Sequence, residues 1–459
     1  MSTAPAEPSR RSPSRRSPTG RGHDRRGHDR EILALAVPAF GALVAEPLFL
    51  MADSAIVGHL GTPQLAGVGV ASAALTTATG VFVFLAYATT AAVARRIGAG
   101  DRRGAVQQGV DGLWLAVGLA VPVVLLTLLL APWAADLLGA SPTAAPYAVT
   151  YLRISSLGIP AMLLVLAATG VLRGLQDTRT PLLVAVGGFT ANIGLNLGLV
   201  YGAGLGVAGS AWGTVLAQTG MAAVYLVVVV RGARRERASL RPDATGIRAG
   251  ARAGGPLLVR TVSLRAVLMI ATAVAARLGD DQVAAHQIAM TLFSFLAFAL
   301  DAIAIAGQAI IGRYLGASDV PGARAATRRM VEWGLGSGVV LGLLVVLARP
   351  LYVPLFTPDP VVQGQLHTAL LLLALSQPVA GLVFVLDGVL MGAGDGPYLA
   401  RAALATLAVF APAAFLVPAT GTGLAGLWWA MNLFMLVRAV FLVARARGGR
   451  WLVTGAVRD

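Results

Sequence analysis

Long apolar stretches separated by short polar ones dominate this chain. A run of roughly 20 apolar residues is long enough to cross a bilayer as a helix. The pattern predicts twelve such spans, at 32–57, 65–94, 108–131, 147–172, 181–201, 206–231, 254–277, 283–313, 331–348, 362–392, 397–418 and 424–445. The runs are continuous and do not alternate every second residue, which excludes a transmembrane barrel. The predicted fold class is an all-α integral membrane protein.

Composition supports a membrane protein and removes some chemistry. Hydrophobic residues make up 56% of the chain and charged residues 12%. No cysteine is present, so a disulfide framework and a thiolate metal site are both excluded. The spans contain no histidine-rich cluster and no H-E-x-x-H helix, and so they do not indicate an intramembrane enzyme. We expect no cofactor and no enzymatic activity.

The arginines give the orientation. All 36 basic residues are arginine, and 30 of them lie in the two tails, in the even-numbered loops or at the span ends beside them. Basic residues collect on the cytoplasmic side, so both termini are predicted to be cytoplasmic. This distribution accounts for the net charge of +15 without a nucleic-acid partner.

An internal repeat divides the chain in two. The segment "LAGVGVA" at 65–71 aligns with "VAAHQIA" at 283–289, "GAGD" at 98–101 with "GASD" at 316–319, and "RGLQD" at 173–177 with "MGAGD" at 391–395. The offset between the two members is the same in every pair. We therefore expect two six-helix lobes related by a pseudo-two-fold axis along the membrane normal.

The repeat sets the domain boundaries. A basic tail, 1–30, is rich in Pro, Ser, Arg and Gly and is predicted to be disordered. The N-lobe covers 31–230, an arginine-rich cytoplasmic linker 231–252, and the C-lobe 253–445; a cytoplasmic C-terminal tail, 446–459, follows. Lobes of this kind commonly rock about a central cavity in transporters, although a duplicated bundle can also be a scaffold or a channel.

Two acids lie within the first span, where an ionised carboxylate is costly. Glu46 and Asp53 are seven residues apart, hence two helical turns apart on one face. At 1.5 Å per residue their backbones are about 10 Å apart, which suits two protonation sites better than a dyad sharing one proton. The alternatives are an interfacial acid without a role at Asp53 and an acid hydrogen-bonded at a kink at Glu46.

Other polar residues of the N-lobe point to the same region. Asn192 and Asn196 are four apart on the fifth span and share a face. Neither they nor the two acids have polar counterparts at the equivalent positions of the second half. Pro38 and Pro47 each free a carbonyl one turn back, and so they predict a kink in the first span that acts either as a gate or as a static bend.

The C-lobe offers a looser set of polar residues as candidates for a substrate site. These are Gln287, Asp301 and Gln308 on the eighth span, Asp387 on the tenth, and Arg265 on the seventh. Arg265 is a candidate ion-pair partner for one of these C-lobe acids, which would give it a structural role. His286 is expected to be packed or interfacial.

Several segments resemble the MATE family, the multidrug and toxic compound extrusion transporters, and its DinF-like branch in particular. They are "PLFLMADSAIVGHLG", "VLRGLQDTRTPL", "AHQIAMTLFSFLAFALDAIAIAGQAIIGRYLGA" and "FVLDGVLMGAGDGPYLA". The resemblance runs from about residue 31 to 445. It implies twelve helices in two lobes with the MATE/MOP-type fold, a multi-pass protein of the bacterial cytoplasmic membrane, and export of amphipathic, often cationic, organic molecules in exchange for H⁺ or Na⁺.

The resemblance also implies roles for individual residues. The family's cation-coupling acid falls on Asp53, its fifth-helix polar pair on Asn192 and Asn196, and its sixth-helix threonine on Thr214 in "GTVLAQ". A hydroxyl-bearing residue of the family is replaced by Phe49. With fewer acids and hydroxyls present, a proton is favoured as the coupling ion over Na⁺ at Asp53, Asn192 and Asn196.

The sequence therefore predicts a monomeric secondary antiporter, embedded in the lipid bilayer, that moves small amphipathic molecules by alternating access. An alternative is a lipid-linked saccharide flippase of the wider MOP superfamily, which would line its cavity with several basic residues. Only Arg260 and Arg265 are expected near the cavity here.

Overall fold

The structure, a computed structural model, describes residues 25–457. In that range the chain is almost entirely helical. The first half consists of α1 (Arg25–Gly58), α2 (Thr62–Gly80), η1 (Val81–Val83), α3 (Phe84–Gly98), α4 (Arg102–Leu137), α5 (Ala145–Ser156), α6 (Ile159–Gly174), α7 (Arg179–Leu197), the π-helix η2 (Gly198–Gly202) and α8 (Gly206–Arg235). The second half consists of α9 (Ala244–Leu278), α10 (Asp280–Gly316), α11 (Val320–Phe356), α12 (Pro360–Gly392), α13 (Gly396–Thr420) and α14 (Gly423–Arg447).

The helices confirm the predicted all-α membrane fold. Eleven stretches in the described part of the chain are long and apolar enough to span, and the pair α5 and α6, bent by 52°, makes a twelfth if it is counted as one span. The bend lies at Leu157 and Gly158, just before Pro160. Pro160 lies in the first turn of α6, where a missing backbone donor is tolerated, so the sequence allows a new helix to begin directly after the bend.

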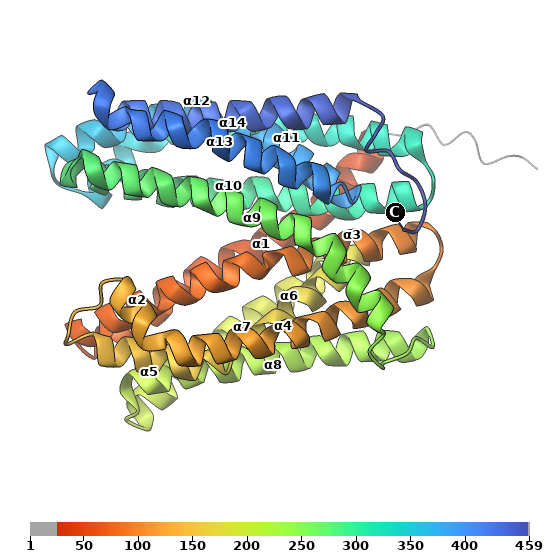
Figure 1. Ribbon diagram of the computed structural model, residues 1–459, viewed down its shortest axis with the longest axis horizontal. Coiled ribbons are helices and arrows are strands. Elements are labelled where there is room, and N and C mark those ends of the chain that lie inside the picture. The colour runs from red at the N-terminus through yellow and green to blue at the C-terminus, as the bar shows by residue number, and fades with distance from the viewer. Residues whose placement is uncertain (1–24, 458–459) are drawn as a thin grey trace, which may run out of the picture.

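The helices gather into two groups, the N-lobe (α1–α8) and the C-lobe (α9–α14), as Figure 1 shows. Only residues 236–243 lie between α8 and α9, so the helices extend into the predicted linker 231–252 from both sides. Asp243 makes this possible because its side chain accepts a hydrogen bond from the Thr245 backbone N–H at 3.0 Å and caps α9.

The basic tail expected at 1–30 lies mostly outside the described residues. Its last residues, 25–30, are helical and begin α1, contrary to the expected disorder. Asp29 explains this order, because its carboxylate forms an ion pair with Arg329 of α11 at 2.6 Å and accepts a hydrogen bond from the Trp333 indole at 2.8 Å.

The lobes meet at the end of the molecule where the C-terminus lies and diverge toward the other end (Figure 1). At the meeting end, α3 packs against α10 at two glycines of the repeat. A Cβ added to Gly98 would overlap the carbonyl oxygen of Arg313, and one added to Gly316 would overlap that of Arg95. Gly98 and Gly316 are equivalent positions of the repeat, as are Arg95 and Arg313, so the internal repeat reappears as a reciprocal contact.

Candidate functional site

Asp53 lies at the centre of a buried polar network in the N-lobe. Its side chain is 3% exposed. Asn196 Nδ2 and Ser210 Oγ donate to Asp53 Oδ1 at 2.6 Å and 2.7 Å, and the Tyr151 hydroxyl donates to Oδ2 at a long 3.5 Å. The carboxylate thus receives donors from α5, α7 and α8, and the three helices are tied to α1 through one charge.

The local sequence places these partners. Ser210 and Thr214 are one turn apart on α8, so both face α7, where Asn192 Nδ2 donates to Thr214 Oγ1 at 3.3 Å. Gly213 lies between them. A Cβ at Gly213 would overlap the Asn196 side-chain oxygen, so glycine is what allows α8 to approach the amide this closely.

A π-helix fixes the C-terminal end of α1 near the site. In η2 the Tyr201 hydroxyl donates to the Ile56 carbonyl oxygen at 2.5 Å. Ile56 is three residues after Asp53, at the end of α1, where helix carbonyls lack intrahelical donors. The extra residue of a π-turn shifts the side chains that follow it, so η2 helps to aim Tyr201 at this carbonyl.

The structure brings some of the predicted site residues together and separates others. Asp53 and Asn196 are hydrogen-bonded, and Asn192 and Thr214 form a neighbouring pair, whereas Glu46 is in neither group. Ser210 and Tyr151 were missed. The spacing of Ser210, one turn before Thr214, was the available signal for one of them; nothing in the sequence distinguished Tyr151 from Tyr147 on the same span.

Two amide oxygens remain unused beside the carboxylate. Asn192 Oδ1 and Asn196 Oδ1 are buried and have no hydrogen-bond partner among residues 25–457. No group of three His, Asp or Glu side chains in that range could hold a metal ion. Any cation at Asp53 would therefore be held by one carboxylate together with amide and hydroxyl oxygens.

Glu46 has different surroundings from Asp53. Its side chain is exposed, and the Arg265 guanidinium of the C-lobe acts on it electrostatically. Arg265 packs over Gly80, where a Cβ would come within 2.5 Å of Nη2, at the junction of α2 and η1. Glu46 and Arg265 therefore bring opposite charges from the two lobes near each other.

The remaining α1 candidates have packing roles in this structure. Phe49 stacks on Phe189 of α7 with ring centroids 5.0 Å apart and planes 10° apart. Pro38 and Pro47 both lie inside α1, which continues as one helix through them. The Thr178 hydroxyl donates to the Ala34 carbonyl at 3.5 Å, the carbonyl that Pro38 leaves without a donor.

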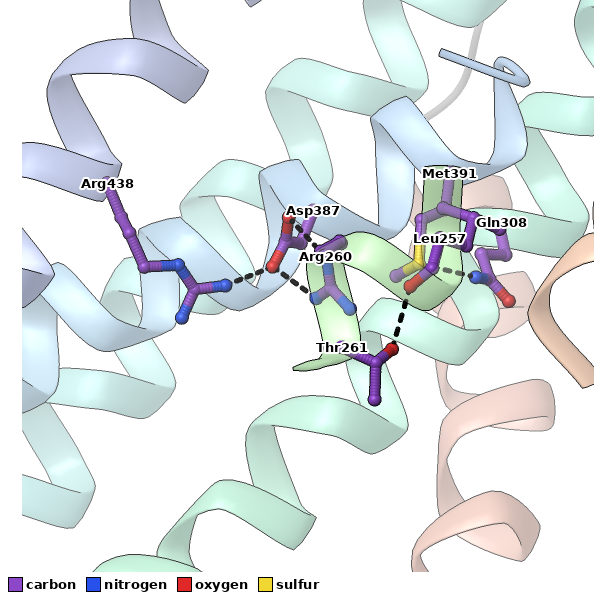
Figure 2. A network of polar contacts seen from close by, with 7 residues as sticks. All are labelled: Leu257, Arg260, Thr261, Gln308, Asp387, Met391 and Arg438. Atoms are coloured by element: carbon purple, nitrogen blue, oxygen red, sulfur yellow. Dashed lines mark hydrogen bonds and ion pairs between the residues drawn. The ribbon is translucent and has the colours of Figure 1, made fainter. Parts of the chain in front are cut away.

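Asp387 forms the main charged cluster of the C-lobe, with Arg260 and Arg438 (Figure 2). Arg260 binds the carboxylate through Nη2 at 2.6 Å and Nε at 3.4 Å, and Arg438 binds it from α14. The prediction that Arg265 pairs with a C-lobe acid is wrong. Arg260 lies at the depth of Asp387, whereas Arg265 is five residues on, about 7.5 Å along the helix and on another face.

The other C-lobe candidates do not form one site. Gln308 is fully buried and its amide contacts the Met391 sulfur at 3.2 Å, as Figure 2 shows. Asp301 lies within electrostatic range of Arg173 and Arg260. Gln287 is exposed near the start of α10, while the neighbouring His286 is buried and packs against Trp428 at 5.9 Å between ring centroids.

The Asp53 network exists in one lobe alone. Asp53, Tyr151 and Asn196 correspond to Ala271, Ala369 and Ala414 in the alignment of the two halves. Ser210 corresponds to Leu427 when "GVAGSAW" at 206–212 is aligned with "GLAGLWW" at 423–429, one residue short of the offset of the other pairs, and all four counterparts are fully buried. The C-lobe thus fills with apolar side chains the space that the N-lobe fills with a charge and its donors.

Comparison with known proteins agrees with this architecture. The MatE family profile matches residues 38–197 and 256–416. The starts of the two matches are separated by the offset of the internal repeat. A solved structure described as the outward-facing conformation of a multidrug resistance MATE family transporter of the MOP superfamily superimposes with a TM-score of 0.84 at 23% identity, over 92% of this chain and 95% of that one.

Curated relatives come from plants and bacteria. Protein DETOXIFICATION 44, chloroplastic, of Arabidopsis thaliana is 32% identical over 92% of this chain and 83% of its own length. DNA damage-inducible protein F of Escherichia coli is 30% identical over 91% of this chain and 92% of its own length. With these matches over nearly the whole chain, this multi-pass membrane protein belongs to the MatE family, whose members are transporters and not enzymes.

Proposed function

We propose that this transporter exports amphipathic organic compounds in exchange for protons, and that Asp53 carries the proton. The observation that supports this most directly is the burial of Asp53 among three donors from three other helices. Adding or removing a proton at Asp53 changes the hydrogen bonds that these three donors can make with its carboxyl group. The charge state of this residue therefore acts on the packing of α1, α5, α7 and α8 together.

The geometry favours Asp53 Oδ2 as the protonated atom. Oδ1 already accepts two short hydrogen bonds, whereas Oδ2 has only the 3.5 Å contact with Tyr151. A phenolic hydroxyl can accept as well as donate. Tyr151 can therefore reverse its role when Oδ2 gains a proton, and the Oδ1 bonds can persist.

A proton fits these partners better than Na⁺. Sodium needs several oxygens converging on one point, but Asn196 presents its NH₂ group to Asp53. The Asn192 NH₂ is likewise used as a donor, toward Thr214. A bound Na⁺ would require both amides to turn round, whereas a proton requires only the titratable carboxyl.

The cycle follows from the two-lobe arrangement. In the proposed topology both termini are cytoplasmic, so the end where the lobes meet faces the cytoplasm and the end where they diverge faces outward. Asp53 then takes a proton from outside, loses its attraction for a cationic substrate, and the substrate leaves. Proton and substrate compete for one negative charge, which couples their opposite movements. Glu46, on which the Arg265 guanidinium of the C-lobe acts electrostatically, is a second candidate protonation site.

The flippase alternative loses support from the arginines. Arg260 is occupied by Asp387 and Arg265 lies beside Glu46, so neither is a free basic group for a saccharide phosphate. We propose that the transporter acts as a monomer in the bacterial cytoplasmic membrane.

Transport in proteoliposomes tests the proposal. Purified protein is reconstituted, an H⁺ or a Na⁺ gradient is imposed separately, and movement of a fluorescent organic cation is followed together with internal pH. Asp53→Asn should abolish proton-driven exchange and proton release on substrate addition, while Glu46→Gln lowers the rate and leaves coupling intact. Full proton-coupled exchange by Asp53→Asn, or exchange driven by Na⁺ alone, contradicts the proposal.

A further inference from the structure

We propose that Arg95 and Arg313 form a reciprocal clasp that holds the two lobes together at the terminal end and sets how often that end opens. This inference rests on the proposed alternating-access cycle, because a cycle of that kind requires the closed end to open. The two arginines occupy equivalent positions in the repeat and reach in opposite directions across the seam between the lobes.

Arg95 reaches from the N-lobe to the C-lobe. It lies at the end of α3 and is 2% exposed. Its Nη1 donates to the carbonyl oxygen of Ala393, just after α12, at 3.3 Å, and its Nη2 donates to that of Val453 in the C-terminal tail at 2.8 Å. One guanidinium therefore binds the loop between α12 and α13 and the tail after α14.

Arg313 makes the mirror arrangement from the C-lobe. It lies near the end of α10, and its Nη1 donates to Gln176 Oε1, just after α6, at 2.9 Å. Its Nη2 forms an ion pair with Glu31 of α1 at 2.5 Å. Each arginine thus binds the equivalent loop of the opposite lobe, "MGAGD" or "RGLQD", and also one terminal segment of the chain.

The terminal segments have additional fastenings on the same seam. The Gly455 backbone N–H donates to the Leu315 carbonyl at 3.0 Å, and Trp451 is buried, which fixes the C-terminal tail. At the start of α1, Asp29 is held by Arg329 and Trp333 of α11. When the lobes part at this end, the C-terminal tail must lose its contact with Arg95, and the start of α1 must lose its contacts with the C-lobe.

Backbone strain at Gln176 indicates that its side chain has a purpose there. Gln176 has a φ of 64°, a conformation that favours glycine, and the equivalent position of the repeat is Gly394 with a φ of 72°. A glutamine at such a position is an outlier that invites a functional explanation. The hydrogen bond from Arg313 supplies one, because a glycine would offer no acceptor.

Distance measurement between the lobes tests the clasp. The chain has no cysteine, so Arg103→Cys at the start of α4 and Arg324→Cys near the start of α11 place two spin labels on exposed positions of opposite lobes. Arg95→Gln and Arg313→Gln should each raise the ratio of long to short distances by about tenfold, since each removes charge-assisted hydrogen bonds across the seam. Removing residues 448–459 should also raise the ratio of long to short distances. In the truncated protein, Arg95→Gln should raise this ratio by less than it does in the full chain, because the contact between Arg95 and Val453 is already lost.

Two further variants separate a clasp from general stabilisation. Arg96→Gln is the matched control, because Arg96 is adjacent to Arg95 but pairs with Asp101 inside the N-lobe at 3.3 Å. Gln176→Gly should raise the long-distance population without lowering the melting temperature, because glycine adopts the backbone conformation without strain.

The outcomes are distinct. Unchanged distances in Arg95→Gln, Arg313→Gln and Gln176→Gly, or an equal shift in Arg96→Gln, overturn the clasp; if Arg95→Gln does not fold, the tail deletion tests the same contact. Failure of the proposed function gives another pattern, in which Asp53→Asn keeps proton-coupled exchange while the clasp variants still change the distances.

Discussion

At the scale of single residues, one carboxylate and one amide define the site. Asp53 and Asn196 were identified from the sequence because a charge inside an apolar span is costly and because the repeat lacks polar counterparts for both. Ser210 and Tyr151 could not be identified in the same way, since hydroxyls are common in spans and their contribution depends on how each helix is rotated. Helical spacing gives faces, and only packing decides which faces meet.

Gly213 allows a sharp test at this scale. Gly213→Ala places a methyl group where the Asn196 amide oxygen lies, so the amide should move away from Asp53 and lose its 2.6 Å hydrogen bond. We expect a folded protein whose rate of proton-coupled exchange falls at least tenfold. A hydrogen bond to a charged group contributes about 1.5–3 kcal/mol, and losing it is enough for this decrease. Exchange rates and the pH dependence of exchange are the measurements.

Gly220→Ala is the control for this substitution. It lies on the same helix, α8, and an added Cβ meets nothing within 4 Å. Wild-type exchange is expected there, with stability unchanged or slightly higher because alanine restricts the unfolded chain. Equal rates in the two variants would show that the Asn196 amide position does not matter.

At the scale of elements, hydropathy located the eleven helices that are long enough to span and the bent pair α5 and α6, because a segment in lipid must satisfy its own backbone hydrogen bonds and a helix does so. The ends of helices were less accessible to prediction. The start of α1 and the start of α9 both reach into polar sequence, where Asp29 and Asp243 provide the partners that hold them. Such partners lie far away in sequence or depend on cap geometry, and composition does not reveal them.

Pro47→Ala tests whether α1 must bend. The substitution restores a backbone donor and one hydrogen bond to the carbonyl of Leu43, so it stiffens the turn of α1 that ends at position 47, beside Glu46. We expect substrate binding to persist and turnover to slow. Pro122→Ala, inside α4, is the comparison. Turnover at the wild-type rate in Pro47→Ala would mean that the proline is a static feature.

At the scale of the whole molecule, the duplicated halves share a seam and differ in their buried charge. The seam is nearly symmetric, with Gly98 against Arg313 and Gly316 against Arg95. The buried polar groups are not symmetric, since Asp53 is in the N-lobe and the Asp387 cluster is in the C-lobe. The repeat in the sequence predicted two lobes, but it could not predict that the equivalent glycines touch the opposite lobe, because an internal offset says nothing about which copies meet.

Gly316→Ala tests the closeness of this seam. The added Cβ overlaps the Arg95 carbonyl, which is backbone and cannot rotate away, so the lobes should separate at this end. The spin-label pair at positions 103 and 324 should then report a larger fraction of long distances. Gly118→Ala, where a Cβ meets nothing within 4 Å, should leave the distances unchanged. A wild-type distance distribution in Gly316→Ala would mean that the contact between the lobes accommodates the added methyl group.

The path of α1 has a mechanical consequence. Near its start, Glu31 is tied to a helix of the C-lobe, and toward its other end Asp53 is tied to three helices of the N-lobe. At 1.5 Å per residue, the stretch between these two anchors is a rod of about 33 Å. When the bodies at its two ends swing apart, a rod anchored to both must either release one anchor or buckle between them. The two prolines lie between the anchors, where the helix lacks backbone hydrogen bonds and bends most easily. Bending of α1 at the prolines therefore competes with breaking the contacts of Glu31 or those of Asp53.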